Sequence, residues 1–284
     1  MITNVCKHFF TVDVEEYFQV SAFERFVNRA DWDHLESRVE TGVEYLLEAL
    51  AKRGSRGTFF VLGWIAERHP DLVKRIAAAG HEVASHGWDH RKVTDQDPTQ
   101  FRESLRRSKC TLEELTDQPV IGFRAPSYSI VRGMEWALDI LLDEGYQYDS
   151  SLFPVSRNGY GYKGGLRSPH WIRRNGGQLL EIPPATLRRF RFNIPAAGGA
   201  YFRLFPFGLI RAALVQAEQN ETAATFYIHP WELDADQPRL RVSPLTKLRH
   251  YGGIGRTRAR LNRLLEEFNF TSIAENISEY EAQL

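Results

Sequence analysis

The sequence predicts an α/β fold built on parallel strands, either a closed (β/α) barrel or a doubly wound sheet. Short apolar stretches alternate along the chain with amphipathic stretches of about 10 to 20 residues, giving roughly six or seven strand–helix repeats. Ionisable residues stand where the apolar stretches end. Because both architectures carry their chemistry at the carboxyl ends of the strands, we expect the functional residues there.

Eight stretches have the apolar, aromatic and β-branched character of strands. In the first, residues 8–18, apolar residues alternate with polar ones, as in a strand with one buried face. The expected strands lie within residues 8–18, 56–63, 81–86, 120–126, 147–151, 178–186, 223–233 and 270–273.

The intervening stretches repeat their apolar residues with the period of a helix. Asp97 followed by Pro98 is typical of a helix start, and Pro70 predicts a break or a restart. The expected helices are residues 41–54, 65–80, 97–117, 132–146, 208–220 and 258–269.

Composition excludes some classes of partner. The chain has 284 residues, 43% of them hydrophobic, which is enough for a sizeable core. Lys and Arg number 36, as do Asp and Glu, so the zero net charge gives no electrostatic case for nucleic acid or an anionic membrane. We interpret the basic clusters at residues 187–192 and 255–263 as solvated faces.

The chain ends and cysteines predict a cytoplasmic protein. Cys6 and Cys110 form no CxxC pattern, so neither a disulfide framework nor a cysteine-based zinc site is readable. Residues 1–18 lack the basic and apolar regions of a signal peptide, and no apolar run reaches the length of a membrane span. The sequence does not indicate an oligomeric state.

Ionisable residues follow six of the expected strands, which scattered surface charges would not be expected to do. They are Asp13 and Glu15, His86 and His90, Arg124, Asp149, Glu181 and His229.

The first group lies in "TVDVEE". Since side chains alternate along a strand, Asp13 and Glu15 point to one side and Glu16 to the other, unless a bulge reverses this. Two converging carboxylates repel unless they share a cation or a proton. The pair is therefore either a base beside a metal ligand or an acidic strand end facing solvent.

The second group lies in "SHGWDH". In a helix, His86 and His90 would share one face and could chelate an ion such as Zn, Co, Ni or Fe. Alternatively, the two histidines cap a loop or bond to the backbone. Asp89 is either an acceptor that orients a ligand histidine or a cap of the turn.

Two further residues end later strands. Arg124 precedes the rigid "APSYS" loop, where it could clamp a carboxylate or form an ordinary salt bridge. His229 is a candidate general acid or base because its pKa is ordinarily near working pH, although a lone histidine can also be structural.

Taken together and in this order, these segments resemble the polysaccharide deacetylase family, the NodB-homology or carbohydrate esterase 4 type, from about residue 8 to 235. The segments are "TVDVEE", "TFFVLG", "HEVASHGWDH", "FRAPSYS", "YDSSLFP" and "FYIHPWELD". With "GGAYFRLFPF", they resemble more narrowly the deacetylases encoded beside exopolysaccharide and exosortase-type loci in Gram-negative bacteria.

The resemblance implies a distorted (β/α) barrel of about seven parallel strands, with one domain over residues 1–284. It also implies a subfamily-specific C-terminal region at residues 150–284 that forms part of the same fold.

The resemblance also implies the roles of the site residues. Asp13 would be the general base, held by Arg124, and His229 the general acid, tuned or oriented by Asp149. The metal, most simply Zn²⁺ but also Co²⁺ or Ni²⁺, would be held by Glu15, His86 and His90. Glu16 competes for the carboxylate ligand, and a backbone N–H near Ser127 and Tyr128 would bind the oxyanion.

The implied activity is metal-dependent hydrolysis of N-acetyl, or alternatively O-acetyl, groups on a polysaccharide, an oligosaccharide or a lipid-linked precursor in exopolysaccharide biosynthesis. Two alternatives remain open: an amidohydrolase of a small cyclic ureide or imide on the same scaffold, and a glycan-binding relative without catalysis.

Overall fold

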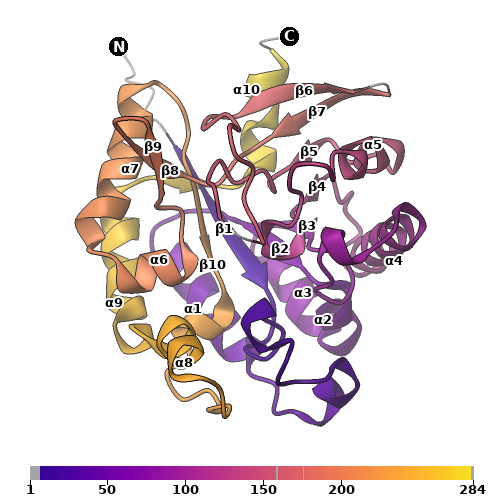
Figure 1. Ribbon diagram of the computed structural model, residues 1–284, viewed down its shortest axis with the longest axis vertical. Helices are drawn as coiled ribbons and strands as arrows, with labels where there is room; N and C mark the ends of the chain where they lie inside the picture. Colours follow the sequence, from indigo (N-terminus) through magenta and orange to yellow (C-terminus); the bar gives the residue numbers. More distant parts are fainter. Residues whose placement is uncertain (1–6, 158, 175, 283–284) are drawn as a thin grey trace.

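A parallel sheet forms the centre of the computed structural model, which describes residues 7–157, 159–174 and 176–282 (Figure 1). Seven strands follow one another in the order β10-β1-β2-β3-β4-β5-β7, and each is parallel to its neighbour. They are β1 (His8–Val14), β2 (Thr58–Val61), β3 (Glu82–Ser85), β4 (Gly122–Phe123), β5 (Tyr148–Asp149), β7 (Gly177–Glu181) and β10 (Thr225–Ile228). The prediction of about seven parallel strands is confirmed.

The two ends of this row approach each other. After β7, the chain forms an isolated parallel bridge between Pro184 and Thr225 of β10, and the Ala185 N–H donates to the Thr225 carbonyl at 3.0 Å. A single bridge, in place of a full ladder, joins the two ends, so the sheet does not form a regular closed barrel. Two more strands extend the sheet: β6 (His170–Arg174) is antiparallel to β7, and β11 (Phe270–Thr271) pairs with the start of β1.

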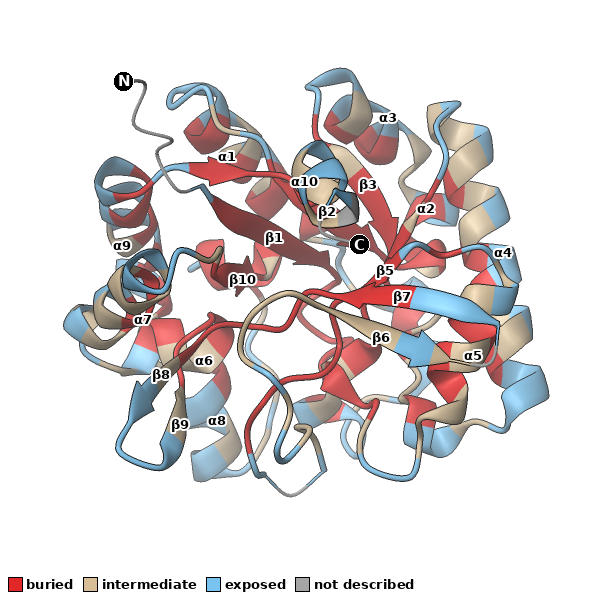
Figure 2. Cartoon of the chain, turned by 90° about the horizontal axis from the view of Figure 1, so that it is seen from above, coloured by how far each residue is buried: buried red, intermediate tan, exposed pale blue. Residues whose placement is uncertain are grey.

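Helices cover the outside of the sheet and turn their buried faces toward it (Figure 2). The helix expected at residues 65–80 is two helices that meet at Pro70, because proline has no N–H to continue the first. Asp97 caps the fourth helix by accepting from the backbone N–H groups of Thr99 and Gln100, as its position predicts. The helices are α1 (Val39–Ala51), α2 (Gly63–Arg68), α3 (Pro70–Ala78), α4 (Pro98–Thr116), α5 (Trp136–Asp143), α7 (Phe207–Gln219) and α9 (Ile254–Glu267).

The C-terminal half contains elements that the periodic pattern did not predict. They are β6, the hairpin of β8 (Thr186–Arg189) and β9 (Phe192–Pro195), and the short helices α6 (Gly199–Leu204), α8 (Pro244–Tyr251) and α10 (Ile277–Glu281). These elements are too short for a repeat to be visible in sequence. The same half supplies β7 and β10 to the main sheet.

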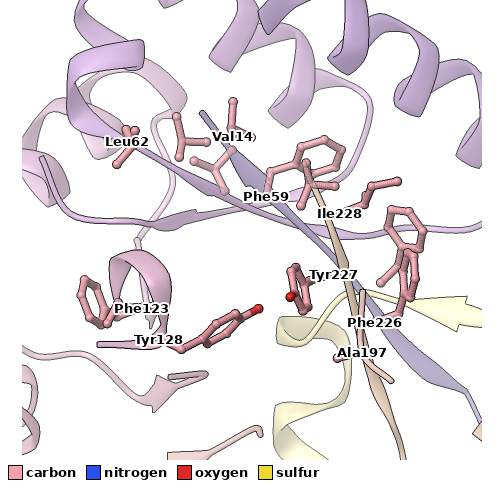
Figure 3. Packing of buried hydrophobic residues seen from close by; sticks show 14 of the residues in the cluster. Val14, Phe59, Leu62, Phe123, Tyr128, Ala197, Phe226, Tyr227 and Ile228 are labelled. Carbon is pink, nitrogen blue, oxygen red and sulfur yellow. The ribbon is translucent and has the colours of Figure 1, made fainter. Parts of the chain in front are cut away.

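Aromatic and aliphatic residues of neighbouring strands form the core (Figure 3). Phe59, Phe226 and Ile228 are fully buried between the sheet and its helices. Tyr128 and Tyr227 face each other across the interior, with ring centroids 5.2 Å apart. This packing fixes the strands whose ends carry the candidate site.

Within the described ranges, no helix combines the length and apolarity that crossing a membrane requires. Cys110 is an exposed free cysteine, and Cys6 lies outside the described residues.

Candidate active site

The ionisable residues that the sequence placed at strand ends are found at the carboxyl ends of adjacent strands. Asp13 lies in β1 and Glu15 directly follows it, while His229 follows the neighbouring β10. Arg124 follows β4 and Asp149 ends β5. Parallel pairing brings these ends to one edge of the sheet, which is why residues distant in sequence meet there.

Glu15, His86 and His90 form a buried cluster with the composition of a metal site. One potential ligand atom from each residue lies within 4.8 Å of the other two. Glu15 Oε2 and His90 Nε2 are 2.7 Å apart, and Glu15 Oε2 has no hydrogen-bond partner among the described residues. A buried carboxylate oxygen without a partner beside two imidazoles fits a divalent cation.

The orientation of His86 is set by the backbone. Its Nδ1 lies 2.8 Å from the carbonyl oxygen of Arg124, so an N–H at Nδ1 donates to that oxygen. The lone pair of Nε2 can then coordinate a cation. Asp89, the alternative orienting residue, instead lies 3.8 Å from the guanidinium groups of Arg29 and Arg91.

The prediction that the two histidines share a helix face is wrong. The segment after β3 is a loop, in which Gly87 has φ 77° and His90 has φ 55°. Its folded-back path nonetheless brings the imidazole centroids to 5.6 Å. Four-residue spacing in a tight loop can therefore produce the same proximity as one helical turn.

The charge states of the cluster suit a cation. Burial opposes ionisation of Glu15, but the neighbouring His90 and His229 outweigh it and lower the pKa of its carboxyl to about 2. Burial lowers the pKa of His86 to about 4, so its imidazole is neutral near pH 7. An ionised carboxylate and a neutral imidazole are the forms that bind metal ions.

Glu16 is directed away from this cluster. Its carboxylate accepts a hydrogen bond from the Ser37 hydroxyl and from the backbone N–H groups of Arg38 and Val39, at the start of α1. An acidic side chain there satisfies N–H groups that the helix itself leaves unpaired. Of the two glutamates considered from the sequence, only Glu15 lies in the cluster.

Asp13 and Arg124 form a buried ion pair. The Arg124 guanidinium donates to Asp13 Oδ1 at 2.7 Å and to the Thr11 hydroxyl at 2.7 Å, and it is fully buried. Asp13 Oδ2 lies 3.8 Å from His229 Nε2. One carboxylate oxygen is therefore fixed by the arginine and the other faces the histidine.

The prediction that Asp149 orients His229 is wrong, because Glu232 makes that contact. Glu232 Oε2 lies 2.9 Å from His229 Nδ1, and its Oε1 accepts from Arg203 Nε at 2.5 Å. Asp149 instead accepts from the Ser151 hydroxyl at 2.5 Å, and its strand β5 pairs with β4 and β7, not with β10.

The sequence held a signal for this contact. Glu232 is three residues after His229, in the single turn η5 (Pro230–Leu233), and it accepts from both the backbone N–H and the ring of His229. A histidine before proline with an acid at the third turn position is a capping-box spacing. Arg203, the other partner of Glu232, lies in the segment "GGAYFRLFPF", which carried part of the family resemblance.

These contacts favour the protonated form of His229. Burial opposes it, but Glu15, Glu232 and Asp13 outweigh burial and raise the pKa of the imidazole to about 9. Its Nε2 is 3.6 Å from Glu15 Oε1. The His229 side chain is 17% exposed and that of Glu15 is 2% exposed, so a substrate would reach the site on the side of His229.

Trp231 contacts both Glu15 and His229. Its indole N–H donates to Glu15 Oε1 at 3.1 Å. The indole stacks on His229 with ring centroids 5.1 Å apart, and on His250 of α8 with centroids 4.2 Å apart. A single residue thus contacts both the candidate metal ligand and the candidate acid.

Asp149 and Glu181 form a second, fully buried carboxyl pair. The pKa of Asp149 is raised by burial to about 6, and burial together with Asp149 raises the pKa of Glu181. Ser151 connects this pair to the site loop, because its hydroxyl accepts from the Ala125 N–H at 2.8 Å. We therefore assign the pair to the support of the loop after β4.

The loop after β4 has a constrained backbone. Ser127 and Tyr128 have φ of 56° and 54°, a region that bulky residues rarely adopt. The Tyr128 N–H donates to the Ala125 carbonyl at 3.0 Å, so it is already used within the loop.

A hollow of about 870 Å³ lies elsewhere. Lys7 and Ala224 at the amino ends of β1 and β10 contribute to its lining, together with Ala185, Glu218 and Tyr280. None of the candidate site residues lines this hollow.

The chain is similar to known deacetylases and to a domain of unknown function. Residues 32–147 match the family model described as polysaccharide deacetylase, and residues 150–278 match a domain of unknown function, DUF3473. A peptidoglycan deacetylase of Helicobacter pylori is 30% identical over 157 residues, covering 51% of this chain and 53% of that protein. A peptidoglycan deacetylase-like protein of Gibberella zeae is 35% identical over 113 residues, covering 39% and 32%.

The chain thus spans about a third to a half of the length of these curated relatives. Among solved structures, a putative polysaccharide deacetylase from Mycobacterium smegmatis aligns over 98% of this chain and 91% of its own, with a TM-score of 0.68 and 23% identity. That likeness shows a shared fold. Residues 32–147 are thus similar to the polysaccharide deacetylase family, and the DUF3473 match follows them in the same chain.

Proposed function

We propose that this protein is a metal-dependent deacetylase that removes N-acetyl groups from a polysaccharide or its lipid-linked precursor in exopolysaccharide biosynthesis. The observation that carries the proposal is the meeting of three sets of residues at one sheet edge. These are a carboxylate–histidine cluster (Glu15, His86 and His90), an arginine-bound aspartate and a histidine held by a glutamate.

Glu15, His86 and His90 would hold the metal, with Zn²⁺ the first choice and Co²⁺ or Ni²⁺ as alternatives. Imidazole and carboxylate ligands suit these ions. Such an ion, when bound, lowers the pKa of water and polarises the acetyl carbonyl.

Asp13 would serve as the general base. Arg124 holds Oδ1, so Oδ2 is available to accept the proton of the attacking water. A positioned base of this kind contributes typically about 10² to 10⁴ in rate.

His229 would serve as the general acid. Glu232 accepts from Nδ1 and Arg203 holds Glu232, so the proton to be transferred resides on Nε2. An amine is a poor leaving group until it is protonated, and Nε2 would deliver that proton to the departing nitrogen.

The oxyanion donor would come from the loop after β4. Since the Tyr128 N–H is bonded within the loop, the Ser127 N–H is the candidate. One donor aimed at a developing oxyanion contributes roughly 3 kcal/mol.

The central test joins metal content with acetate release. We expect purified protein to bind a divalent metal and to release acetate from N-acetylated chitooligosaccharide, and His86→Ala or His90→Ala to lose both. His34→Ala, at an exposed histidine remote in sequence from the cluster, is the matched control and should retain both.

The outcomes separate the proposal from its rivals. Full metal content and full rate in His86→Ala would remove the metal assignment. Ring opening of a cyclic ureide without acetate release would favour the amidohydrolase. Tight glycan binding without turnover by metal-loaded protein would favour the non-catalytic relative.

A further inference from the structure

The chain has a strongly basic segment in spite of its zero net charge. Between residues 237 and 265 there is no Asp or Glu, and there are eight Arg or Lys residues. In and before α8, the side chains of Arg241, Lys247 and Arg249 are exposed. Among the ion pairs of the described residues, none involves these three.

Exposed leucines accompany these charges. Leu245 and Leu248, three residues apart in α8, are 64% and 59% exposed. Leu204 at the end of α6 is 41% exposed, and its side chain and the Leu248 carbonyl both lie beside Gly252. We call Leu204, Arg241, Leu245, Lys247, Leu248 and Arg249 the α8 patch.

The α8 patch belongs to the element that supports the candidate acid. His250 of α8 stacks on Trp231, which stacks on His229. Arg203, which binds Glu232, also donates to the carbonyl of Arg249 at 2.9 Å. Figure 1 shows α8 on the outside of the molecule, below α6 and α9. A partner that binds the α8 patch therefore lies close to the candidate active site.

We propose that the α8 patch docks on an anionic lipid surface, with the leucines entering the headgroup region and the basic side chains meeting lipid phosphates. A soluble polyanion would pair with the charges but leave three leucines in water. A short amphipathic helix that combines Lys and Arg with Leu is the pattern of interfacial binding. This inference goes beyond the proposed function and does not rest on it.

The test is sedimentation of the full chain with vesicles. We expect it to bind phosphatidylcholine vesicles that contain phosphatidylglycerol, not vesicles of phosphatidylcholine alone, and to bind less as salt is raised. Lys247→Glu should weaken vesicle binding by about fivefold or more. Leu245→Ser with Leu248→Ser should weaken it by about tenfold.

Matched controls are Leu166→Ser, at a leucine 58% exposed outside the patch, and Lys74→Glu on α3. Both should bind as the wild type does. All variants should melt as the wild type and release acetate from soluble chitooligosaccharide at its rate, which keeps this test separate from that of the proposed function. Absence of binding to anionic vesicles would overturn the proposal. So would undiminished binding by the leucine variant, or binding to a soluble acidic polymer in place of vesicles.

Discussion

The buried pair of Arg203 and Glu232 provides a quantitative test of how the site is held together. Both side chains are 1% exposed, and the guanidinium also donates to the carbonyls of Gly252 and Arg249. Removing one partner of such a pair leaves a charge buried without its counter-ion, at a cost of about 3–5 kcal/mol in the free energy of unfolding. Glu232→Gln and Arg203→Met should each show a loss of this order.

The double variant distinguishes an ion pair from two independent contacts. With both charges removed, neither is left unpaired, so the combined loss should fall short of the sum of the single losses by about 2 kcal/mol. Denaturant unfolding of the wild type and the three variants measures this, provided that the denaturant dependence stays the same in all four.

The exposed pair of Arg53 and Glu266 is the matched control. Its side chains are 41% and 55% exposed, so Arg53→Met and Glu266→Gln should each change stability by less than about 1 kcal/mol. The reasoning that Glu232 is a buried, charge-paired residue that supports His229 is refuted by either of two results. One is that the buried single variants lose no more free energy of unfolding than the exposed ones. The other is that the losses of Glu232→Gln and Arg203→Met simply add in the double variant.

Three further predictions follow from neighbouring contacts. Glu15→Gln should lose bound metal, whereas Glu16→Gln should keep it and lose about 1 kcal/mol of stability at the start of α1; metal analysis and unfolding separate the two. The pKa of Asp149 is about 6 against an ordinary 3.8, so the folded state keeps a proton that the unfolded state has released. Stability should therefore fall as pH rises through this range. Because the pKa of Glu181 is raised as well, Glu181→Gln should make the decrease of stability with pH shallower in thermal melts. An unchanged pH dependence in that variant would contradict the coupling of the two carboxyls. Gly42→Ala would place a methyl group 2.1 Å from the carbonyl oxygen of Pro230, which follows His229. The variant should therefore lose about 1–3 kcal/mol in the free energy of unfolding, and its acetate release should also decrease.

Much of the candidate site follows from local sequence pattern. Asp13, Glu15, Arg124 and His229 each stand at the end of an apolar, strand-like stretch, and parallel strands bring their carboxyl ends together. The opposite orientations of Glu15 and Glu16 follow from the two-residue period of a strand, and the structure has both where that period puts them.

Other parts could not be predicted in this way. The histidine spacing suggested a helix, but the backbone follows a loop with positive φ at Gly87 and His90, a conformation decided by packing. Asp149 was expected to orient His229, yet its strand β5 pairs with β4 and β7 and not with β10, whereas Glu232 is adjacent to His229 through its own turn.

By itself, the sequence determined the alternation of strands and helices and the sheet edge that carries the ionisable residues, because these depend on short-range periodicity. The metal and proton-transfer roles of those residues were implied by the family resemblance. Only the tertiary structure decided that Trp231 joins His229 to Glu15, and that α8 carries exposed leucines beside basic side chains with no ion pair among the described residues. The contact between Trp231 and Glu15 joins residues 216 positions apart, and a local pattern contains no information about such a pairing.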